Sequence, residues 1–473
     1  VFVAMHWGSE YLGGHSSTGA PMAGVNALTN PAFCPVSKQP ELKHTAVKVL
    51  KAELPWSLLA MAWVSETDAL AARDALRALM PRFAFATCVP FGRERSGVLL
   101  RAAAYEAPRD DTLAQIELLL GLAGAEVLRY ADRKKGQRRA MRVDDLFQLQ
   151  SMTKPVATVA ALQLMERGLL QLSDPVAKFL PEFADLRVAM ARADAPGGHV
   201  LVPVVRPITI LDLLTHRAGF VGLAASDSPA ARLQREAYAA RPAAHGETLQ
   251  QAVAFVATLP LEAQPGATFR YGPATIVLGR VIEVVTGRTL QAALREQIFV
   301  PLGMHDTDFV VPPHKQSRIV PPYAYRAGRG LVRLPLDPPA PRLFSAGGNL
   351  WSTAGDYLRF CQMLLNGGEL DGTRILDRAS VELMTTPQVD TLPMSFLPGQ
   401  AFGLGVAIRK ADAPDTVPGS PGTYGWSGAY NTWFRIDPRE QAIYALFVQL
   451  AFSPADTELH RAFQAAAAGA FVR

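Results

Sequence analysis

The stretch FQLQSMTKPVATVAALQLMERG, from Phe147 to Gly168, changes its pattern of apolar residues halfway along. Its first residues alternate apolar and polar side chains, as on a strand with one buried face. After Pro155 the apolar residues recur at helical intervals, and a glycine follows the last of them, as at a helix C-terminus. Because proline is tolerated in a first helical turn, the pattern predicts a helix that begins near Ser151.

Ser151 would then lie at a helix N-terminus, where free N–H groups and the helix dipole favour developing negative charge. Lys154 follows three positions later and is expected on the same face of the helix. A serine needs a neighbouring base to act as a nucleophile, and a desolvated lysine supplies one. The pattern favours acyl transfer. On this spacing alone, however, an N-capping serine with a solvated lysine is the simpler interpretation.

The bulk properties indicate a globular protein of two or three structural units. The chain has 473 residues, of which 49% are hydrophobic, and its longest apolar run is too short to span a bilayer. We see no signal-peptide pattern at the start, and the three scattered cysteines are typical of reduced thiols, so we expect a cytoplasmic location. Histidines in metal-binding spacing are absent from the sequence, so we expect no metal.

The net charge of +5 is unevenly distributed along the chain. Through Asp144 there are 18 basic and 14 acidic residues, a balance of +4, and the remainder has 29 and 28, a balance of +1. The part that carries Ser151 is thus almost neutral, which argues against a polyanionic substrate. The cluster DRKKGQRR indicates a solvated hairpin, with nucleic-acid binding as the minor alternative.

Local patterns predict further elements along the chain. Helices are expected over 67–80, over 111–122 and in AGDYLRFCQMLLNGG, and strands in FAFATCV, GVLLRAAAYE, AEVLRYA, TWFRIDP and AIYALFVQL. The region between the Ser151 helix and the last third reads as helices with turn-rich joints.

Two later stretches are candidates for the rest of an acyl-transfer site. Tyr271, in PGATFRYGPATIVLGRVIEVVTG, stands at the mouth of an apolar helix, although a tyrosine there also suits a simple cap on the core. Glycines in YGWSGAYNTWF would let backbone N–H groups approach a ligand, as an oxyanion hole requires; a hairpin with a bulge is the alternative. The G-x-S-x-G pattern of α/β-hydrolases is absent, since GWSGA around Ser427 ends in alanine.

Five ordered segments together resemble family VIII carboxylesterases, the esterase branch of the class C β-lactamase-like serine hydrolases. The segments are LFQLQSMTKPVATVAALQLMERGLLQLSDPVAKFLPEF, ITILDLLTHRAGF, QPGATFRYGPATIVLGRVIEVVTG, LFSAGGNLWSTAGDYLRFCQMLLNGG and YGWSGAYNTWFRIDP, spread over residues 145–473. Five matches in order are far more specific than S-x-x-K alone. The resemblance implies an α/β (α+β) fold: a β-lactamase/transpeptidase-like antiparallel sheet flanked by helices, with a mainly helical subdomain over about 165–340.

The resemblance also implies roles for particular residues. Ser151 would be the nucleophile, Lys154 its hydrogen-bonded partner, and Tyr271 the general base and then the acid to the leaving alcohol, although which of Lys154 and Tyr271 is formally the base stays open. The N–H groups of Ser151 and Ala429 would form the oxyanion hole. Substrate-binding residues would be Trp426, Ser427 and Gly428, in the place of the third motif, and Trp351.

Two departures from the β-lactamase pattern bear on the substrate. Pro273 stands where β-lactamases have an asparagine that donates to an acyl amide, and Trp426 replaces a cationic lysine. Both changes favour neutral, apolar esters. We therefore expect a serine carboxylesterase that hydrolyses short-chain esters through an acyl-enzyme, with no cofactor and a small-molecule ester as its partner rather than nucleic acid or membrane. The sequence gives no oligomeric state.

Residues 1–128 have a different resemblance. VFVAMHWGSEYLGG, VNALTNPAFCPVSKQPELKHTAVKV and FATCVPFGRERSGVLLRAAAYEAP are similar to the C-terminal end of a molybdopterin-dependent assimilatory nitrate reductase. The parts of such enzymes that hold most of the cofactor are not in this sequence, so we expect no pterin chemistry. We expect 129–473 to form the hydrolase domain, with strands near 98–105 and 125–130 and a helix from 67–80 or 111–122 completing its sheet.

Two alternatives to the esterase remain at this stage. A β-lactamase or D-alanyl carboxypeptidase of the same fold would differ in substrate class, and an inactive chimera or interaction module would show no hydrolysis. The aromatic residues Trp351, Trp426, Tyr430 and Phe344 suit either a substrate pocket or the core.

Overall fold

The structure, a computed structural model, describes part of the chain in detail. The described residues are 2–6, 56–62, 84–88, 98–104, 125–132, 142–223, 226–241, 246–326, 330–336, 341–390, 399–414 and 419–451. Backbone contacts divide the chain into two units. The first comprises Val1–Asp145, Glu440–Phe447 and Ser453–Arg473, and the second comprises Leu146–Arg439 and Val448–Phe452.

Most of the described residues of the first unit lie in strands. They are β1 (Phe2–His6), β2 (Trp56–Ala62), β3 (Ala84–Cys88), β4 (Val98–Ala104), β5 (Ala125–Asp132) and β18 (Ala442–Leu446). An antiparallel sheet has the order β3-β4-β2-β5, and β1 pairs with β18. The predicted strands in FAFATCV, GVLLRAAAYE, AEVLRYA and AIYALFVQL are confirmed, whereas β2 was not predicted. The predicted helices at 67–80 and 111–122 lie outside the described residues.

The strands β4 and β5, which we expected to complete the hydrolase sheet, both pair with β2. That expectation and the domain boundary at 128/129 stay predictions.

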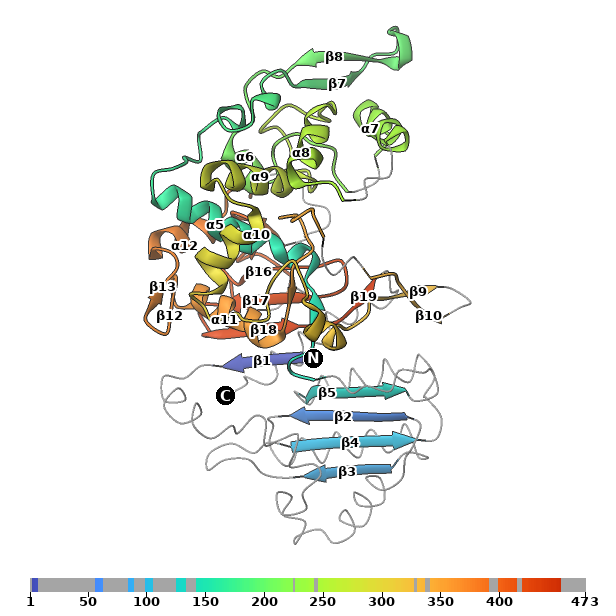
Figure 1. Cartoon of the computed structure of the whole chain (residues 1–473), viewed down its shortest axis with the longest axis vertical. Coiled ribbons are helices and arrows are strands. Elements are labelled where there is room, and N and C mark those ends of the chain that lie inside the picture. Colours follow the sequence, from blue (N-terminus) through green and yellow to red (C-terminus); the bar gives the residue numbers. More distant parts are fainter. Residues whose placement is uncertain are drawn as a thin grey trace. The chain divides into compact units, whose positions relative to one another are not determined.

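The second unit is a mixture of helices and short antiparallel strands (Figure 1). Its α-helices are α5 (Thr153–Glu166), α6 (Ile210–Leu214), α7 (Pro229–Ala240), α8 (Leu249–Ala257), α9 (Ala274–Thr286), α10 (Leu290–Leu294), α11 (Ala354–Leu365) and α12 (Arg378–Met384). Shorter helical turns are η4 (Gln150–Met152), η5 (Val176–Lys178), η6 (Pro181–Phe183), η7 (Pro196–Gly198), η8 (Arg295–Phe299) and η9 (Pro313–Arg318).

The strands of this unit form several small sheets. They are β6 (Phe147–Gln148), β7 (Arg187–Ala191), β8 (His199–Pro203), β9 (Tyr323–Arg326), β10 (Gly330–Arg333), β11 (Trp351–Ser352), β12 (Glu369–Leu370), β13 (Thr373–Arg374), β14 (Gln400–Phe402), β15 (Ala407–Arg409), β16 (Tyr424–Ser427), β17 (Trp433–Asp437) and β19 (Leu450–Ala451). The strands β14, β15, β16 and β17 pair antiparallel in that order. Strand β6 pairs with β11, and β7 pairs with β8.

Helix α5 is the central helix of the second unit. Nearly all of its residues are buried, which fits a helix that is apolar around its whole circumference rather than on one stripe. Pro155 lies in its first turn, and Gly168, with a φ of 70°, follows its end. The predicted helix is therefore confirmed. Helix α5 packs against α9 and α10, and α9 also packs against α6 and α8.

Side-chain caps fix where the surrounding helices begin. Thr209 and Asp212 form a reciprocal capping box at α6, and Thr248 and Gln251 form another at α8. Helix α9 ends at Gly287 in a left-handed conformation, which glycine adopts without steric cost. These helices lie within the interval 165–340, together with the β7–β8 hairpin, and the bounds that we expected for a helical subdomain stay a prediction.

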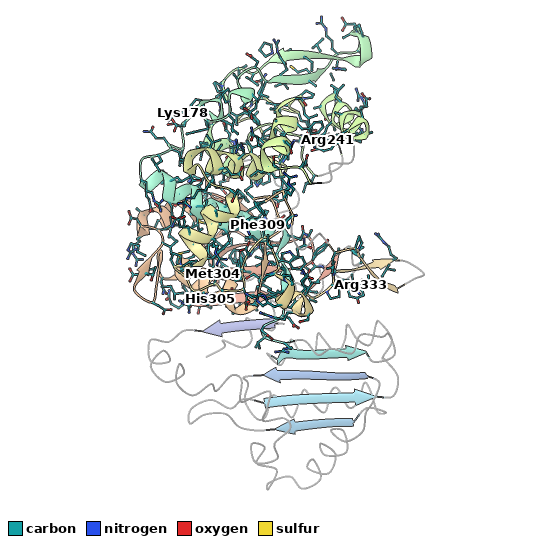
Figure 2. The ribbon with its side chains drawn as sticks, viewed as in Figure 1. Lys178, Arg241, Met304, His305, Phe309 and Arg333 are labelled. Atoms are coloured by element: carbon teal, nitrogen blue, oxygen red, sulfur yellow. The ribbon has the colours of Figure 1, made fainter. Side chains whose placement is uncertain are left out.

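The remaining core lies between α11 and strands β14–β17. Helix α11 packs against β17, and its buried Tyr357 donates a hydrogen bond to the carbonyl oxygen of Met152 at 2.8 Å. Phe309 is fully buried, with its ring centroid 5.4 Å from that of Phe344 (Figure 2). These contacts attach the segment before α5 to the sheet side of the unit.

Two general properties of the described residues bear on function. Within them, no helix combines the length and apolar character needed to cross a bilayer. The same residues contain no cluster of three or more histidine, cysteine or carboxylate side chains suited to a metal ion.

Candidate active site

Ser151 lies in η4, the helical turn that joins β6 to α5. The residue before it, Gln150, has a φ of 51°, a left-handed conformation that is uncommon for a residue with a side chain. Immediately before that, the N–H of Leu149 donates to the carbonyl of Leu350 at 2.8 Å. A fixed strand end followed by a left-handed residue turns the chain sharply, and this turn places Ser151 at the head of α5.

Lys154 is the direct partner of Ser151. Its ammonium donates to Ser151 Oγ at 2.9 Å and to the carbonyl oxygen of Gly347 at 2.7 Å. The side chain of Lys154 is only 5% exposed, so these two bonds act in surroundings with little water. The expectation that both residues share one helix face is confirmed by the short contact between their side chains.

Tyr271 lies beside this pair, just before α9. The Lys154 ammonium is 4.8 Å from the centroid of the Tyr271 ring, close enough for a cation–π contact. The Tyr271 hydroxyl accepts a hydrogen bond from the indole N–H of Trp426 at 3.2 Å. Pro273 occupies the N-cap position of α9 and has no side-chain donor. The structure thus brings Ser151, Lys154 and Tyr271 together through Lys154.

The turn between β16 and β17 carries the expected oxyanion-hole residue. The N–H of Gly428 donates to the backbone carbonyl of Thr432 at 2.7 Å, and the Thr432 hydroxyl donates to the carbonyl of Leu149 at 2.9 Å. A Cβ at Gly428 would lie 2.3 Å from the same Leu149 carbonyl, so only glycine fits there. Ala429 follows and is exposed, and in the part of the chain that the structure describes its N–H has no hydrogen-bond partner.

The aromatic residues divide between the site and the core. Trp426 is only 4% exposed, and its indole supports the Tyr271 hydroxyl. Trp351 is 2% exposed, pairs with Gln148 in the sheet and packs in a cluster with Leu146 and Val311. This packing fits the core role that the sequence left open for Trp351, and its role in substrate binding stays a prediction. Ser427 is half-buried at the end of β16.

His216 is a site residue that the sequence did not single out. Its ring centroid lies 4.7 Å from that of Tyr271, and it is buried after α6. Burial, followed by the charge of Lys154, lowers the pKa of His216 to about 3. The segment LDLLTHRAGF entered the sequence argument only through its resemblance, because no periodicity links position 216 with position 271.

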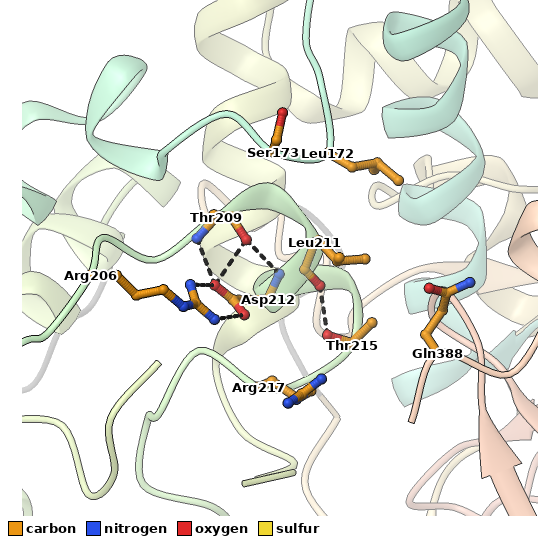
Figure 3. A pocket seen from close by; sticks show the side chains of 9 residues that line it. All are labelled: Leu172, Ser173, Arg206, Thr209, Leu211, Asp212, Thr215, Arg217 and Gln388. Atoms are coloured by element: carbon orange, nitrogen blue, oxygen red, sulfur yellow. Dashed lines mark hydrogen bonds and ion pairs between the residues drawn. The ribbon is translucent and has the colours of Figure 1, made fainter. Parts of the chain in front are cut away.

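A cavity of about 550 Å³ is lined in part by Thr215 and Arg217, the two neighbours of His216 in the chain (Figure 3). Its lining residues are Leu172, Ser173, Arg206, Thr209, Leu211, Asp212, Thr215, Arg217 and Gln388. None of the residues that we expected to be catalytic lines this cavity. Arg206 and Asp212 form a two-pronged ion pair in its wall, with distances of 2.6 and 2.8 Å. The residues that we expected to be catalytic meet at Ser151 and not in this cavity.

The arrangement of antiparallel sheet and helices defines a β-lactamase/transpeptidase-like hydrolase fold. The solved structure of simvastatin synthase (LovD) from Aspergillus terreus resembles it with a TM-score of 0.60 at 23% identity, covering 90% of this chain and 96% of that one. At 23% identity, this likeness supports a shared fold and nothing more.

The sequence comparison identifies the family. The family model described as Beta-lactamase matches residues 117–469, and the chain therefore belongs to the Beta-lactamase family. Protein Rv1367c of Mycobacterium tuberculosis is 36% identical over 323 residues, which cover 65% of this chain and 78% of that protein. Esterase EstB of Burkholderia gladioli is 31% identical over 327 residues, which cover 64% and 77%.

Proposed function

We propose that this protein is a serine carboxylesterase that hydrolyses short-chain carboxylic esters through an acyl-enzyme formed on Ser151. The observation that carries the proposal is the 2.9 Å hydrogen bond from the buried Lys154 ammonium to Ser151 Oγ, beside the hydroxyl-bearing Tyr271. A serine paired with a buried lysine is an activated nucleophile. The similarity to Esterase EstB supports an ester as substrate.

In the acylation step, Ser151 Oγ attacks the carbonyl carbon of the ester, and its proton passes to the Lys154–Tyr271 pair. The pair begins this step one proton short, as a phenolate beside the ammonium or as a neutral amine beside the phenol, so that it has a base to accept the proton. The new O–C bond converts the carbonyl into a tetrahedral oxyanion, which the N–H groups of Ser151 and Ala429 would stabilise. Collapse of this intermediate breaks the bond to the alcohol, which leaves with a proton from Tyr271. The acyl group stays on Ser151.

In the deacylation step, water attacks the acyl carbon while the Lys154–Tyr271 pair takes its proton. The second oxyanion collapses, Ser151 recovers its proton, and the carboxylic acid is released. The hydrogen bond from the Trp426 indole to the Tyr271 hydroxyl stabilises negative charge on that oxygen, which supports Tyr271 as a proton carrier in both directions.

The chemistry around the site favours neutral esters over β-lactams and peptides. Pro273 has no side-chain donor for an acyl amide, and Trp426 presents a neutral indole where a lysine would attract a substrate carboxylate. A penicillin or a D-alanyl peptide would therefore lack two attractions that β-lactamase-like enzymes supply.

The test is hydrolysis of p-nitrophenyl acetate, butyrate and a long-chain ester by the wild type, Ser151→Ala and Ser427→Ala. We expect the wild type to favour the short esters and Ser151→Ala to lose at least about a thousandfold in kcat. Ser427, the serine of GWSGA, is the competing candidate for the nucleophile. Because its expected role is in substrate binding, Ser427→Ala should change KM but keep its acylation burst. Loss of the burst in Ser427→Ala alone would contradict the assignment of the nucleophile.

The substrate class is tested with nitrocefin and a penicillin in the same buffer. Turnover comparable with that of p-nitrophenyl butyrate would favour the β-lactamase alternative. Folded wild type that hydrolyses none of these compounds would favour the inactive-chimera alternative.

A further inference from the structure

His216 holds a backbone conformation that is uncommon for residues with a side chain. Its φ is 53°, in the left-handed region, where histidine occurs more often than most residues other than glycine, and it is only 1% exposed. Such a conformation persists where surrounding contacts fix the residue, and it often occurs at functional sites. The contacts of His216 therefore indicate which role this conformation serves.

The main chain and the ring of His216 both reach the segment that carries Tyr271. The carbonyl of His216 accepts a hydrogen bond from the N–H of Arg270, the residue before Tyr271, at 2.7 Å. The imidazole lies against the Tyr271 ring, with centroids 4.7 Å apart and planes tilted by 56°. His216 thus holds both the backbone just before Tyr271 and one face of the Tyr271 ring.

Tyr271 is part of a closed set of aromatic contacts with Trp426, Phe402 and His216. Its ring lies 5.3 Å from that of Trp426, and Trp426 meets Phe402 edge-on at 5.2 Å. Phe402 in turn meets His216 edge-on at 5.6 Å. Phe269 also packs against His216 and Phe402, but it is not one of the residues that link Tyr271, Trp426, Phe402 and His216. Tyr271 is therefore held on two sides by rings that share Phe402 as a common support.

If the ring of His216 served packing alone, an imidazole would be an unfavourable side chain at this position. Within the described part of the chain, the buried Nδ1 of His216 has no hydrogen-bond partner. A buried polar atom without a partner reduces stability, and an apolar ring of similar size would avoid that cost. The chain has histidine here despite both the left-handed backbone and the unpartnered nitrogen.

We propose that His216 is a positioning residue for the ester hydrolysis proposed above: its carbonyl and its ring fix Tyr271 so that the phenol hydroxyl stays at the Trp426 indole and the ring stays beside Lys154. The proposal rests on that proposed function. His216 takes no proton and touches no substrate. It acts by limiting the rotation and displacement of Tyr271, on which the geometry of proton transfer depends.

The electrostatic surroundings agree with this role. The ionisable groups that face His216 are Lys154 on α5 and the Tyr271 phenol, and the remaining neighbours are the rings of Phe269 and Phe402. Burial and then the Lys154 charge lower the pKa of His216 to about 3. A neutral ring therefore supports Tyr271 without placing a second cation beside Lys154.

The test compares three substitutions of His216 with a matched control. His216→Leu removes the ring, His216→Asn removes the ring but tolerates the left-handed backbone, and His216→Phe keeps a ring of similar size. Phe269→Leu is the control, because Phe269 packs against His216 and Phe402 in the same cluster. The readouts are kcat and KM for p-nitrophenyl butyrate, the rate at which a fluorophosphonate labels Ser151, and the thermal unfolding midpoint.

We expect His216→Leu and His216→Asn to lower kcat and the labelling rate by about ten- to a hundredfold, with KM changed much less. His216→Phe should restore most of both rates. Phe269→Leu should lower the unfolding midpoint and leave kcat near that of the wild type. Unchanged kcat in folded His216→Asn, or an equal loss of kcat in Phe269→Leu, would overturn the proposal.

The labelling rate separates this proposal from the proposed function. A wild type that hydrolyses no ester but labels at Ser151 would remove the esterase assignment and leave the role of His216 to be decided by the labelling rates of the variants. A folded wild type that is not labelled at all would overturn both, because a positioning role requires a reactive serine.

Discussion

The indole N–H of Trp426 donates a hydrogen bond to the hydroxyl of Tyr271 at 3.2 Å, and the two rings lie 5.3 Å apart. A side chain that replaces a cation at this place in the fold thus acts on the tyrosine rather than on a substrate carboxylate. In the proposed mechanism this bond would stabilise negative charge on the phenol oxygen during proton transfer to and from Tyr271.

Trp426→Phe should therefore lower kcat for p-nitrophenyl butyrate by about tenfold, the equivalent of one hydrogen bond. Trp433→Phe is the control, since Trp433 is equally buried on the neighbouring strand. We expect Trp433→Phe to reduce the unfolding midpoint while its kcat stays near that of the wild type. Equal losses of kcat in the two variants would show that general loosening of the sheet, and not the missing donor, is responsible.

Replacement of Lys154 by methionine tests the proton-handling pair. Methionine has a similar length but provides no donor for Ser151 Oγ or for the Gly347 carbonyl. We expect kcat/KM to fall by about 10² to 10⁴-fold, the range for loss of a general acid–base group. Lys178→Met, on the exposed surface, is the control and should be fully active. Stopped-flow measurement of the acylation burst tests whether Lys154 takes part in acylation. A normal burst in Lys154→Met would exclude it from that step.

Gly428→Ala tests the turn that carries the oxyanion donor. The added Cβ would lie 2.2 Å from Thr432 Oγ1 and 2.3 Å from the Leu149 carbonyl, so the turn must move away from Ser151. We expect kcat to fall by about ten- to a hundredfold, because the donors then miss the oxyanion position. Gly355→Ala is the control: its Cβ meets only Thr353 Oγ1, at 3.9 Å, and helix α11 favours alanine. Full activity in Gly428→Ala would argue against the assigned oxyanion hole.

The lowered pKa of His216 predicts a pH dependence of stability. Between its ordinary value of 6.5 and about 3, the unfolded chain binds a proton at His216 and the folded chain does not. Proton binding then favours the unfolded state, so stability falls as the pH decreases through this window. From about pH 7.5 to about pH 5, the wild type should lose about 2 kcal/mol more free energy of unfolding than His216→Phe. Urea denaturation at both pH values measures the difference, and parallel losses in the two proteins would refute the assignment.

The sequence predicted the local geometry of the site well and its long-range geometry only through resemblance. The spacing of Ser151 and Lys154 sufficed, because residues three apart share a helix face and Gly168 marks the end of that helix. Tyr271 was a candidate from its place at the mouth of an apolar helix, but its role, and Ala429, were named from the resemblance, since no spacing rule connects these residues with Ser151. Their catalytic roles stay proposals.

Two kinds of information were not in the sequence pattern. Trp351 and Trp426 are both buried aromatics on short strands, but only Trp426 reaches Tyr271, and the direction of a side chain depends on strand pairing. His216 was missed because its role arises from a contact between segments far apart in the chain. A left-handed φ is likewise a property of the folded backbone, which composition does not reveal.

The hydrogen bond between Thr432 and the carbonyl of Leu149 joins residues that are 283 positions apart in the chain. Contacts of such long range form only after a large loop has closed, so they are late and slow events in folding. The helices around α5 rely on local contacts and form earlier. During refolding, the helical circular-dichroism signal should therefore return before Ser151 becomes reactive. In the interval, the chain is a partly folded intermediate with exposed strand edges, and aggregation competes with the final closure of the site.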